Sequence, residues 1–120
     1  MPMVKLGEVE ARFARIIWDN EPITTARLVQ ICKDQLNWKR TTTYTVLKRL
    51  SDRGLFQNQD GVVTSLISRE GFCGQQSREF VEETFDGSLP AFLAAFASRK
   101  KLTRDEVEEI RRMIDSYEEG

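Results

Sequence analysis

Residues 37–55, NWKRTTTYTVLKRLSDRGL, are the stretch that decides the fold predicted for this chain. Five Lys or Arg residues stand there against one acid, Asp52, so the formal charge is 5 minus 1, or +4, whereas the whole chain of 120 residues carries −1. Apolar residues recur in it at helical spacing, and short hydroxyl side chains are interleaved with the cations. A helix that is anchored on one face and offers cations and short polar groups on the other is suited to reading DNA in the major groove.

We expect this helix over residues 39–52. Positions 3, 4 and 7 apart share one helical face, which gives the inner line Thr43, Val46, Leu47 and Leu50. The side chains left outside are the candidate DNA-binding residues Lys39, Arg40, Thr41, Thr42, Tyr44, Thr45, Lys48 and Arg49. We expect the cations to contact phosphates, and the threonines and Tyr44 to approach base edges or thymine methyl groups.

Two amphipathic helices are predicted upstream. Residues 8–18 carry an apolar stripe at helical spacing, and a turn around Pro22 separates them from a second helix that Thr24 or Thr25 would cap. The apolar face of the second helix includes Cys32, which we interpret as a small core residue rather than a reactive thiol.

Downstream, residues 55–58 and 62–67 are two short β-prone runs around the pair Asp60-Gly61. An Asp-Gly pair between such runs is a strong hairpin signal, and Gly54 suits the left-handed residue after a helix end. Three helices followed by a hairpin are the order of a winged helix-turn-helix. The predicted fold is therefore mainly α with a small β-hairpin wing, and the third helix is its recognition helix.

The rest of the chain is helical and acidic. Residues 1–70 contain 11 Lys/Arg and 8 Asp/Glu, giving +3, whereas residues 71–120 contain 7 and 11, giving −4. We expect a winged-helix DNA-binding domain over residues 1–69 and a helical dimerisation domain over residues 70–120. About fifty residues of apolar helix cannot form an independent core of normal size, so a second copy of the chain is expected to cover them. Folding back onto the winged domain is the alternative.

The candidate dimerisation residues are the apolar side chains of these C-terminal helices. They are Phe72, Phe80, Val81, Phe85, Leu89, Phe92, Leu93, Phe96, Val107, Ile110 and Ile114.

Composition disfavours several classes of function. The chain has no histidine and only two cysteines, so we expect no metal site, no cofactor and no disulfide framework, and an enzyme is disfavoured because the commonest general base is missing. No apolar run is long enough to span a bilayer and the first residues lack a signal-peptide core, so we expect a cytoplasmic protein. A winged helix that serves as a protein-interaction module without specific DNA binding is the alternative function.

Several fixed motifs together resemble one family. They are LGE at 6–8, IIW at 16–18, Trp38, and TxxTxLxRLxxxG at 42–54, followed by a hairpin and three helices. Over about residues 5–118 the chain resembles the penicillinase and methicillin repressor family of winged-helix transcriptional regulators. The resemblance implies a homodimeric repressor that binds palindromic operators upstream of resistance genes, with Thr42, Thr45 and Arg49 as outward positions of the recognition helix.

Three departures from that family bear on its partners. The wing has no basic residue between Phe56 and Ser68. A regulatory protease cuts the β-lactam-responsive repressors at an Asn-Phe bond, but the aligned pair here is Ala95-Phe96, so this partner is implied less strongly than operator DNA. The Cys-x-Cys pairs of copper-responsive relatives are missing, which disfavours copper sensing.

Overall fold

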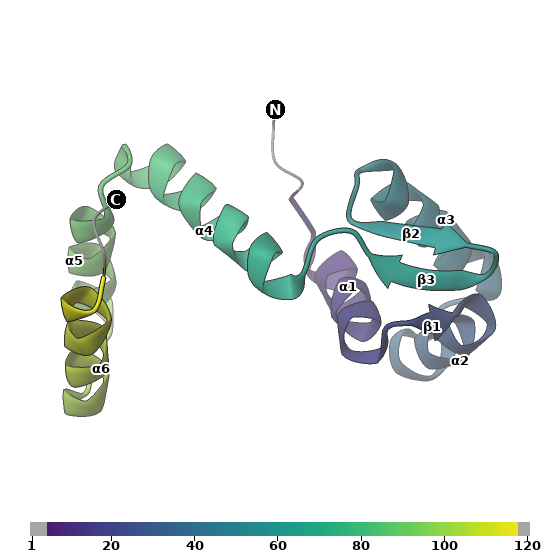
Figure 1. The fold of residues 1–120 in the computed structure, drawn as a ribbon, viewed down its shortest axis with the longest axis horizontal. Helices are drawn as coiled ribbons and strands as arrows, with labels where there is room; N and C mark the ends of the chain where they lie inside the picture. Colours follow the sequence, from purple (N-terminus) through teal and green to yellow (C-terminus); the bar gives the residue numbers. More distant parts are fainter. Residues whose placement is uncertain (1–4, 118–120) are drawn as a thin grey trace. The chain divides into compact units, whose positions relative to one another are not determined.

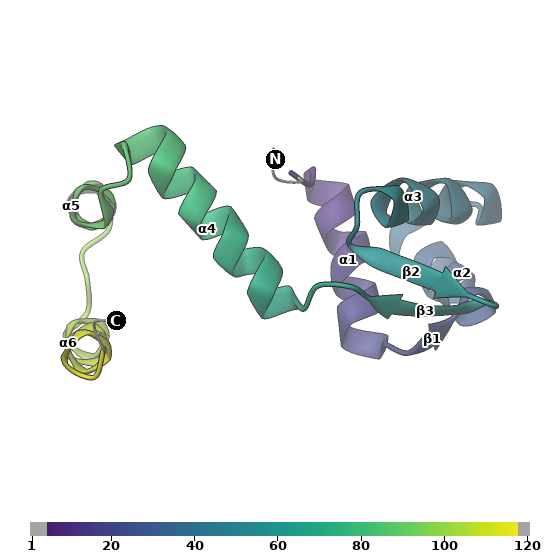
Figure 2. The same cartoon turned by 45° about the horizontal axis from the view of Figure 1, so that its top comes forward.

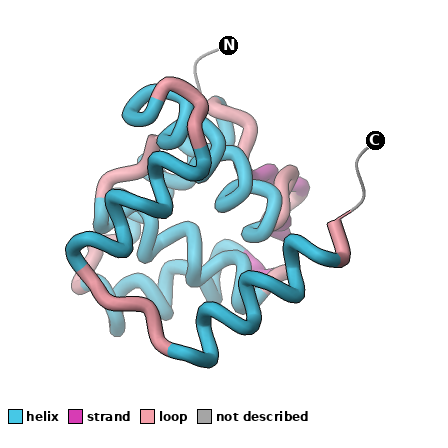
Figure 3. The backbone as a smooth tube through the Cα atoms, turned by 90° about the vertical axis from the view of Figure 1, so that its left-hand side faces the viewer, coloured by secondary structure: helices cyan, strands magenta, loops and turns pink. Residues whose placement is uncertain are grey.

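The computed structural model describes residues 5–117, which form two compact units that divide after Glu79. Figure 1 shows the elements of both units, and Figure 3 shows that helices make up most of the backbone while strands occupy a small part of it. The predicted fold class is confirmed: the chain is mainly helical, with a β-hairpin after the third helix that belongs to a small antiparallel sheet. The functional division predicted after residue 69 stays a prediction.

The first unit contains three helices before the hairpin. Their bounds are α1 Glu8–Asn20, α2 Thr25–Leu36 and α3 Arg40–Asp52. The N–H of Gly7 donates to Glu10 Oε1 at 3.3 Å, which caps α1. Of the two threonines considered for α2, Thr24 is the cap, because its hydroxyl oxygen accepts from the N–H of Arg27 at 3.1 Å.

The hairpin is part of a three-stranded antiparallel sheet. Its strands are β1 Ile23–Thr24, β2 Phe56–Gln59 and β3 Val62–Ser65, in the order β1-β3-β2 (Figure 2). The turn between β2 and β3 has positive φ at both Asp60 (52°) and Gly61 (83°), as a tight hairpin turn requires. The sequence did not predict β1, because two residues are too few to show alternation.

The core of the first unit lies between the helices and the sheet. Its largest fully buried apolar side chains are Phe13, Ile17, Leu28, Leu50, Phe56 and Val63. They come from α1, α2, α3, β2 and β3. The strand β1 adds the buried side chain of Ile23, and α4 adds that of Phe72. The recognition helix is thus held on its inner face by a shared core.

The helix α4, Arg69–Phe85, begins in the first unit and ends in the second, and Gly74 does not interrupt it. The second unit continues with α5, Leu89–Arg99, and α6, Arg104–Asp115. A capping box begins α6: Thr103 Oγ1 accepts from the N–H of Glu106, whose carboxylate accepts from the N–H of Thr103. Figure 2 shows α5 and α6 along their axes as separate helices joined by residues 100–103.

Candidate nucleic-acid interface

A tight turn sets α3 against α2. Asn37 adopts the left-handed conformation (φ 56°), and both its N–H and that of Trp38 reach the carbonyl oxygen of Cys32. The indole ring of Trp38 then packs on Phe13 with ring centroids 5.3 Å apart. Trp38 therefore anchors the turn, which leaves the first residues of α3 on the outside.

The two faces of α3 are divided as the periodicity predicted. Thr43, Val46, Leu47 and Leu50 are buried. The eight candidate DNA-binding residues are all exposed or half-buried: Lys39, Arg40, Thr41, Thr45, Lys48 and Arg49 are exposed, and Thr42 and Tyr44 are half-buried. The structure thus brings all eight to the surface of one helix and its cap.

The cations of this surface differ in their surroundings. Lys48 pairs with Asp52 one turn later, with Nζ to Oδ2 at 3.3 Å. Arg49 instead pairs with Glu10 of α1, with Nη2 to Oε2 at 3.1 Å. The sequence reasoning missed Glu10 in this role, since no local pattern links residues 39 positions apart.

Tyr44 is held by two neighbours. The guanidinium of Arg40 lies 5.5 Å from the centre of the tyrosine ring, a cation–π distance. A hydrogen bond with Thr25 lowers the pKa of the Tyr44 phenol, and Arg40 lowers it further. Because the N–H of Thr25 also donates to the carbonyl oxygen of Gly61 at 2.9 Å, the start of α2 joins the recognition helix to the turn of the wing.

The threonine hydroxyls are used in different ways. Thr45 Oγ1 donates to the carbonyl oxygen of Thr41 at 2.8 Å, so its lone pairs can still accept a hydrogen bond, and the residue is exposed. Thr43 Oγ1 makes a longer bond, 3.4 Å, to the carbonyl oxygen of Lys39 and is buried. Thr45 is therefore available as an acceptor or as an apolar contact, whereas Thr43 belongs to the core.

The wing offers no positive charge. Its turn is closed by Asn58, whose Oδ1 accepts from the N–H of Gly61 at 3.0 Å, and Asp60 is exposed beside it. An acid at this position is repelled by a phosphate backbone. The positive charge of the candidate interface is therefore concentrated on α3 and the residues next to it.

Lys33 is a cation that the sequence reasoning did not single out. Together with Trp38, Lys39 and Arg40 it lines a shallow depression at the turn between α2 and α3. Its position in the last turn of α2, just before the helix-turn-helix bend, is the signal that could have identified it.

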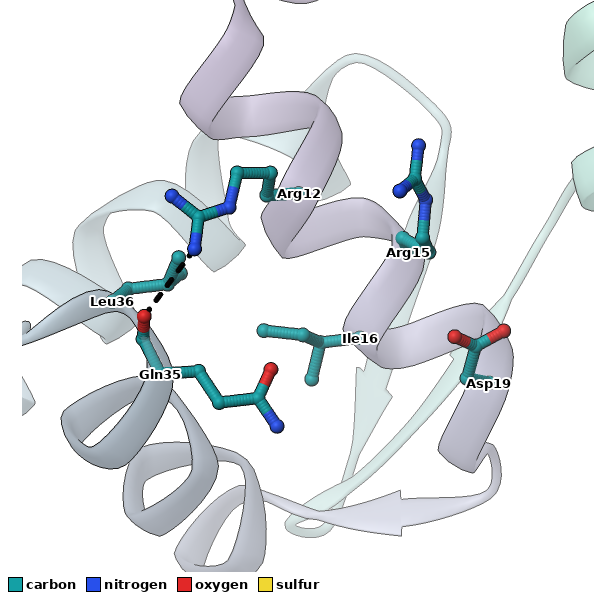
Figure 4. Close-up of a pocket in the computed structure, with 6 residues that line it drawn as sticks. All are labelled: Arg12, Arg15, Ile16, Asp19, Gln35 and Leu36. Atoms are coloured by element: carbon teal, nitrogen blue, oxygen red, sulfur yellow. Dashed lines mark hydrogen bonds between the residues drawn. The ribbon is translucent and has the colours of Figure 1, made fainter.

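A separate pocket of about 150 Å³ lies between α1 and α2 (Figure 4). It is lined by Arg12, Arg15, Ile16, Asp19, Gln35 and Leu36. Arg12 Nη2 donates to the carbonyl oxygen of Gln35 at 3.4 Å, so this arginine satisfies one of the free carbonyl groups at the end of α2. None of the predicted DNA-binding residues lines this pocket.

Comparison with known proteins gives a family of repressors, which is consistent with the exposed cations and threonines of α3. The family model described as penicillinase repressor matches residues 6–116. The chain belongs to the penicillinase repressor family. It is 22% identical over 115 residues to the methicillin resistance regulatory protein MecI of Staphylococcus aureus strain Mu50, covering 92% of this chain and 94% of that protein. It is 21% identical over 117 residues to the penicillinase repressor of Bacillus licheniformis, covering 94% of this chain and 91% of that protein.

Members of the penicillinase repressor family are transcriptional repressors with a DNA-binding winged helix and are not enzymes. The predicted resemblance is therefore confirmed. No helix within residues 5–117 is long and apolar enough to cross a membrane. Among the same residues there is no cluster of three or more His, Cys, Asp or Glu side chains that could hold a metal ion.

The candidate dimerisation residues of this family member lie in different surroundings. Phe72 is buried in the core of the first unit, where its ring lies 5.6 Å from that of Trp18, so it is not part of an exposed surface. In the second unit, Phe80, Phe85, Phe92 and Phe96 form a chain of ring contacts between 5.7 and 6.2 Å. The exposed members of the set are Phe80, Leu89, Phe96 and Ile114, and the half-buried ones are Val81, Phe85, Phe92, Leu93, Val107 and Ile110.

Proposed function

We propose that this protein binds a palindromic operator as a homodimer and represses transcription of the genes beside it. The observation that carries the proposal is the division of α3 into a buried apolar face and an exposed face of cations and threonines. The N-terminal residues of a recognition helix are the ones that reach base edges, and Arg40, Thr41 and Thr42 begin α3.

Phosphate binding falls to the cations of α3 and of its N-cap that face solvent. Lys39 and Arg40 are exposed, and Lys48 makes an exposed ion pair with Asp52. Each phosphate contact releases counterions and makes affinity depend on salt. We expect the threonines and Tyr44 to contact bases instead. Since the wing carries no cation, we infer that α3 supplies most of the DNA contact.

The second unit supports the homodimer. None of its described side chains, in residues 80–117, is buried, although four phenylalanines gather there and Met113, Ile114 and Tyr117 of the C-terminal segment are exposed. Exposed apolar surface of this kind marks an interaction site, and a second copy of the same chain is its commonest occupant. Two recognition helices related by a two-fold axis would meet successive major grooves about 34 Å apart.

The test of this function is selection of bound sequences from random duplex DNA by the purified protein. We expect enrichment of a palindrome whose half-sites are about one helical turn, or a multiple of it, apart. The double variant Thr42→Val, Thr45→Val is the matched control, because it leaves all cations in place and should retain DNA with weaker sequence preference.

A folded protein that enriches no sequence and is not retained by heparin or random duplex would contradict the proposal. It would favour the alternative, a winged helix that binds another protein. Retention on random duplex without enrichment would support DNA binding but not an operator.

The regulated genes are proposed from the relatives alone: antibiotic-resistance or related genes, as the names of the two repressors above indicate. A regulatory protease is the proposed partner with the least support. Ala95 stands before Phe96 in place of the asparagine of the β-lactam-responsive repressors, although both residues are exposed on α5. Intact-mass measurement of the protein after exposure of its cells to a β-lactam tests for such a cut.

A further inference from the structure

The ion pair between α1 and α3 uses both oxygens of one carboxylate. Glu10 Oε1 accepts from the N–H of Gly7 at the start of α1, and Glu10 Oε2 meets Arg49 Nη2 at 3.1 Å. The carboxylate thus ties the cap of α1 to the recognition helix. Both partners lie in the first unit.

The ion pair of Arg49 with Glu10 is less exposed to solvent than that of Lys48 with Asp52. The side chains of Arg49 and Glu10 are 46% and 21% exposed, whereas those of Lys48 and Asp52 are 78% and 65% exposed. Exposed pairs are screened by solvent and break at little cost, but Glu10 is mostly covered and has a second bond that fixes its position. A phosphate can therefore recruit Lys48 easily, whereas recruiting Arg49 would leave Glu10 without its counter-charge.

The position of Arg49 along α3 also separates it from the reading end. It is the tenth of the 13 residues of Arg40–Asp52, while the bases are read from the start of a recognition helix. Residues three, four and seven apart lie on one side of a helix, so Thr42, Thr45 and Arg49 share one outward line. Of these three residues, Arg49 is the one that forms an ion pair with α1.

We propose that Glu10 and Arg49 are positioning residues that set the angle of α3, and that Arg49 contacts no phosphate. This inference rests on the proposed DNA binding and replaces the phosphate contact expected for Arg49. The buried face of α3 holds the helix against the core, and the pair fixes its tilt from the side.

A small tilt is enough to matter. At 1.5 Å per residue, Thr42 lies about 10 Å along the helix axis from Arg49. If α3 tilts by about 10° about its Arg49 end, Thr42 therefore moves by about 2 Å. A hydrogen bond to a base edge does not tolerate such a displacement, but a flexible lysine can follow a phosphate over that distance. Loss of the pair should therefore reduce sequence discrimination and leave non-specific binding unchanged.

The experiment compares two neutral variants of neighbouring residues, Arg49→Gln and Lys48→Gln, with Glu10→Gln and the double variant Glu10→Gln, Arg49→Gln. Each is measured by fluorescence anisotropy against the site that the wild-type protein selects and against random duplex, over a range of salt concentrations. Circular dichroism confirms the fold of each variant. Glutamine keeps the length of Glu10 and its acceptor for the cap of α1.

Arg49→Gln should lower the preference for the selected site roughly tenfold, the order of one good base contact, without changing the salt slope on random DNA. Glu10→Gln should give the same loss, and the double variant no more than either, because the two residues act as one contact. Lys48→Gln should instead lower the salt slope by about 0.9 with the preference retained.

A lower salt slope in Arg49→Gln, or tighter binding of random duplex by Glu10→Gln, would mean that Arg49 contacts a phosphate. Either result would overturn this inference and leave the proposed function intact. Additive losses in the double variant would do the same. A folded wild-type protein that binds no duplex would overturn the proposed function together with it.

Discussion

The indole Nε1 of Trp18 donates a hydrogen bond of 3.0 Å to the carbonyl oxygen of Ile67. The same indole lies 5.5 Å from the ring of Phe56 in the wing and 5.6 Å from that of Phe72 in α4. One side chain of α1 therefore fixes the segment that leaves the wing and the first turns of α4. The first unit consequently extends past the hairpin and includes the start of the helix that leads to the second unit.

Trp18→Phe should destabilise the first unit. It keeps an aromatic ring but removes the donor to a partly buried carbonyl oxygen, which costs about 1 kcal/mol, with a further loss from the smaller ring. Urea denaturation followed by circular dichroism measures the change. The matched control is Trp38→Phe, because Trp38 packs through its ring on Phe13, a contact that a phenylalanine ring can also make. Equal losses in the two variants would contradict a specific role for the Trp18 hydrogen bond.

Local patterns predicted α3 well and its tertiary partners poorly. The helical period placed Thr43 and Leu50 inside and Thr45 outside because these positions follow from the sequence of one helix. The pair of Glu10 with Arg49 depends on how two helices cross, which no local pattern encodes. For the same reason the sequence grouped Phe72 with the C-terminal apolar residues, although packing against Trp18 buries it in the first unit.

Lys48→Ala should weaken binding to the selected site and to random duplex alike. The side chain of Lys48 is 78% exposed and leaves its pair with Asp52 easily, so it is free to neutralise a phosphate. The salt slope should fall by about 0.9 for this one contact. Lys101→Ala removes the same charge from an exposed position in the second unit and should leave the slope unchanged. Identical slopes for Lys48→Ala and the wild type would place Lys48 outside the interface.

Thr45→Val should relax the preference at one position of each half-site. The hydroxyl hydrogen of Thr45 is already donated to Thr41, so its contribution to a base is an accepted bond or a methyl contact. Valine keeps the methyl group and removes the oxygen, whereas Thr45→Ser does the reverse. A panel of single-base operator variants should show which of the two changes alters the ranking. An unchanged ranking in both variants would exclude base reading by this residue.

One of the two thiols should react quickly in the folded protein. Cys73 is exposed, whereas Cys32 is fully buried and its burial raises the thiol pKa to about 11, above the ordinary 9.0. At pH 8 a chromogenic disulfide reagent should titrate one thiol per chain rapidly and the second only after denaturant is added. Cys73→Ser should abolish the fast phase, and a fast phase that survives in this variant would mean that Cys32 is accessible.

The raised pKa of Cys32 also predicts how stability depends on pH. Between pH 9 and 11 the unfolded chain releases a proton that the folded chain retains, so the contribution of this thiol to stability is complete below pH 9 and is lost as the pH rises through about 11. Denaturation midpoints at pH 8 and pH 10 should therefore differ less in Cys32→Ala than in the wild type. The alanine variant starts from a lower midpoint because it leaves a small cavity.

Ile114→Asp should turn the proposed dimer into monomers and, for that reason, weaken operator binding more than random binding. The side chain of Ile114 is 63% exposed in the single chain, so an aspartate there costs the isolated second unit little. In a dimer interface the same carboxylate would lose its hydration without a partner.

Phe92→Asp should also give monomers, but Phe92 contacts three other rings, so its effect on the fold of the unit must be measured as well. Arg112→Asp places an aspartate on the opposite side of α6 and should leave the dimer intact. Sedimentation at micromolar concentration separates these outcomes, and a dimer that persists in Ile114→Asp would move the interface away from the apolar side of α6.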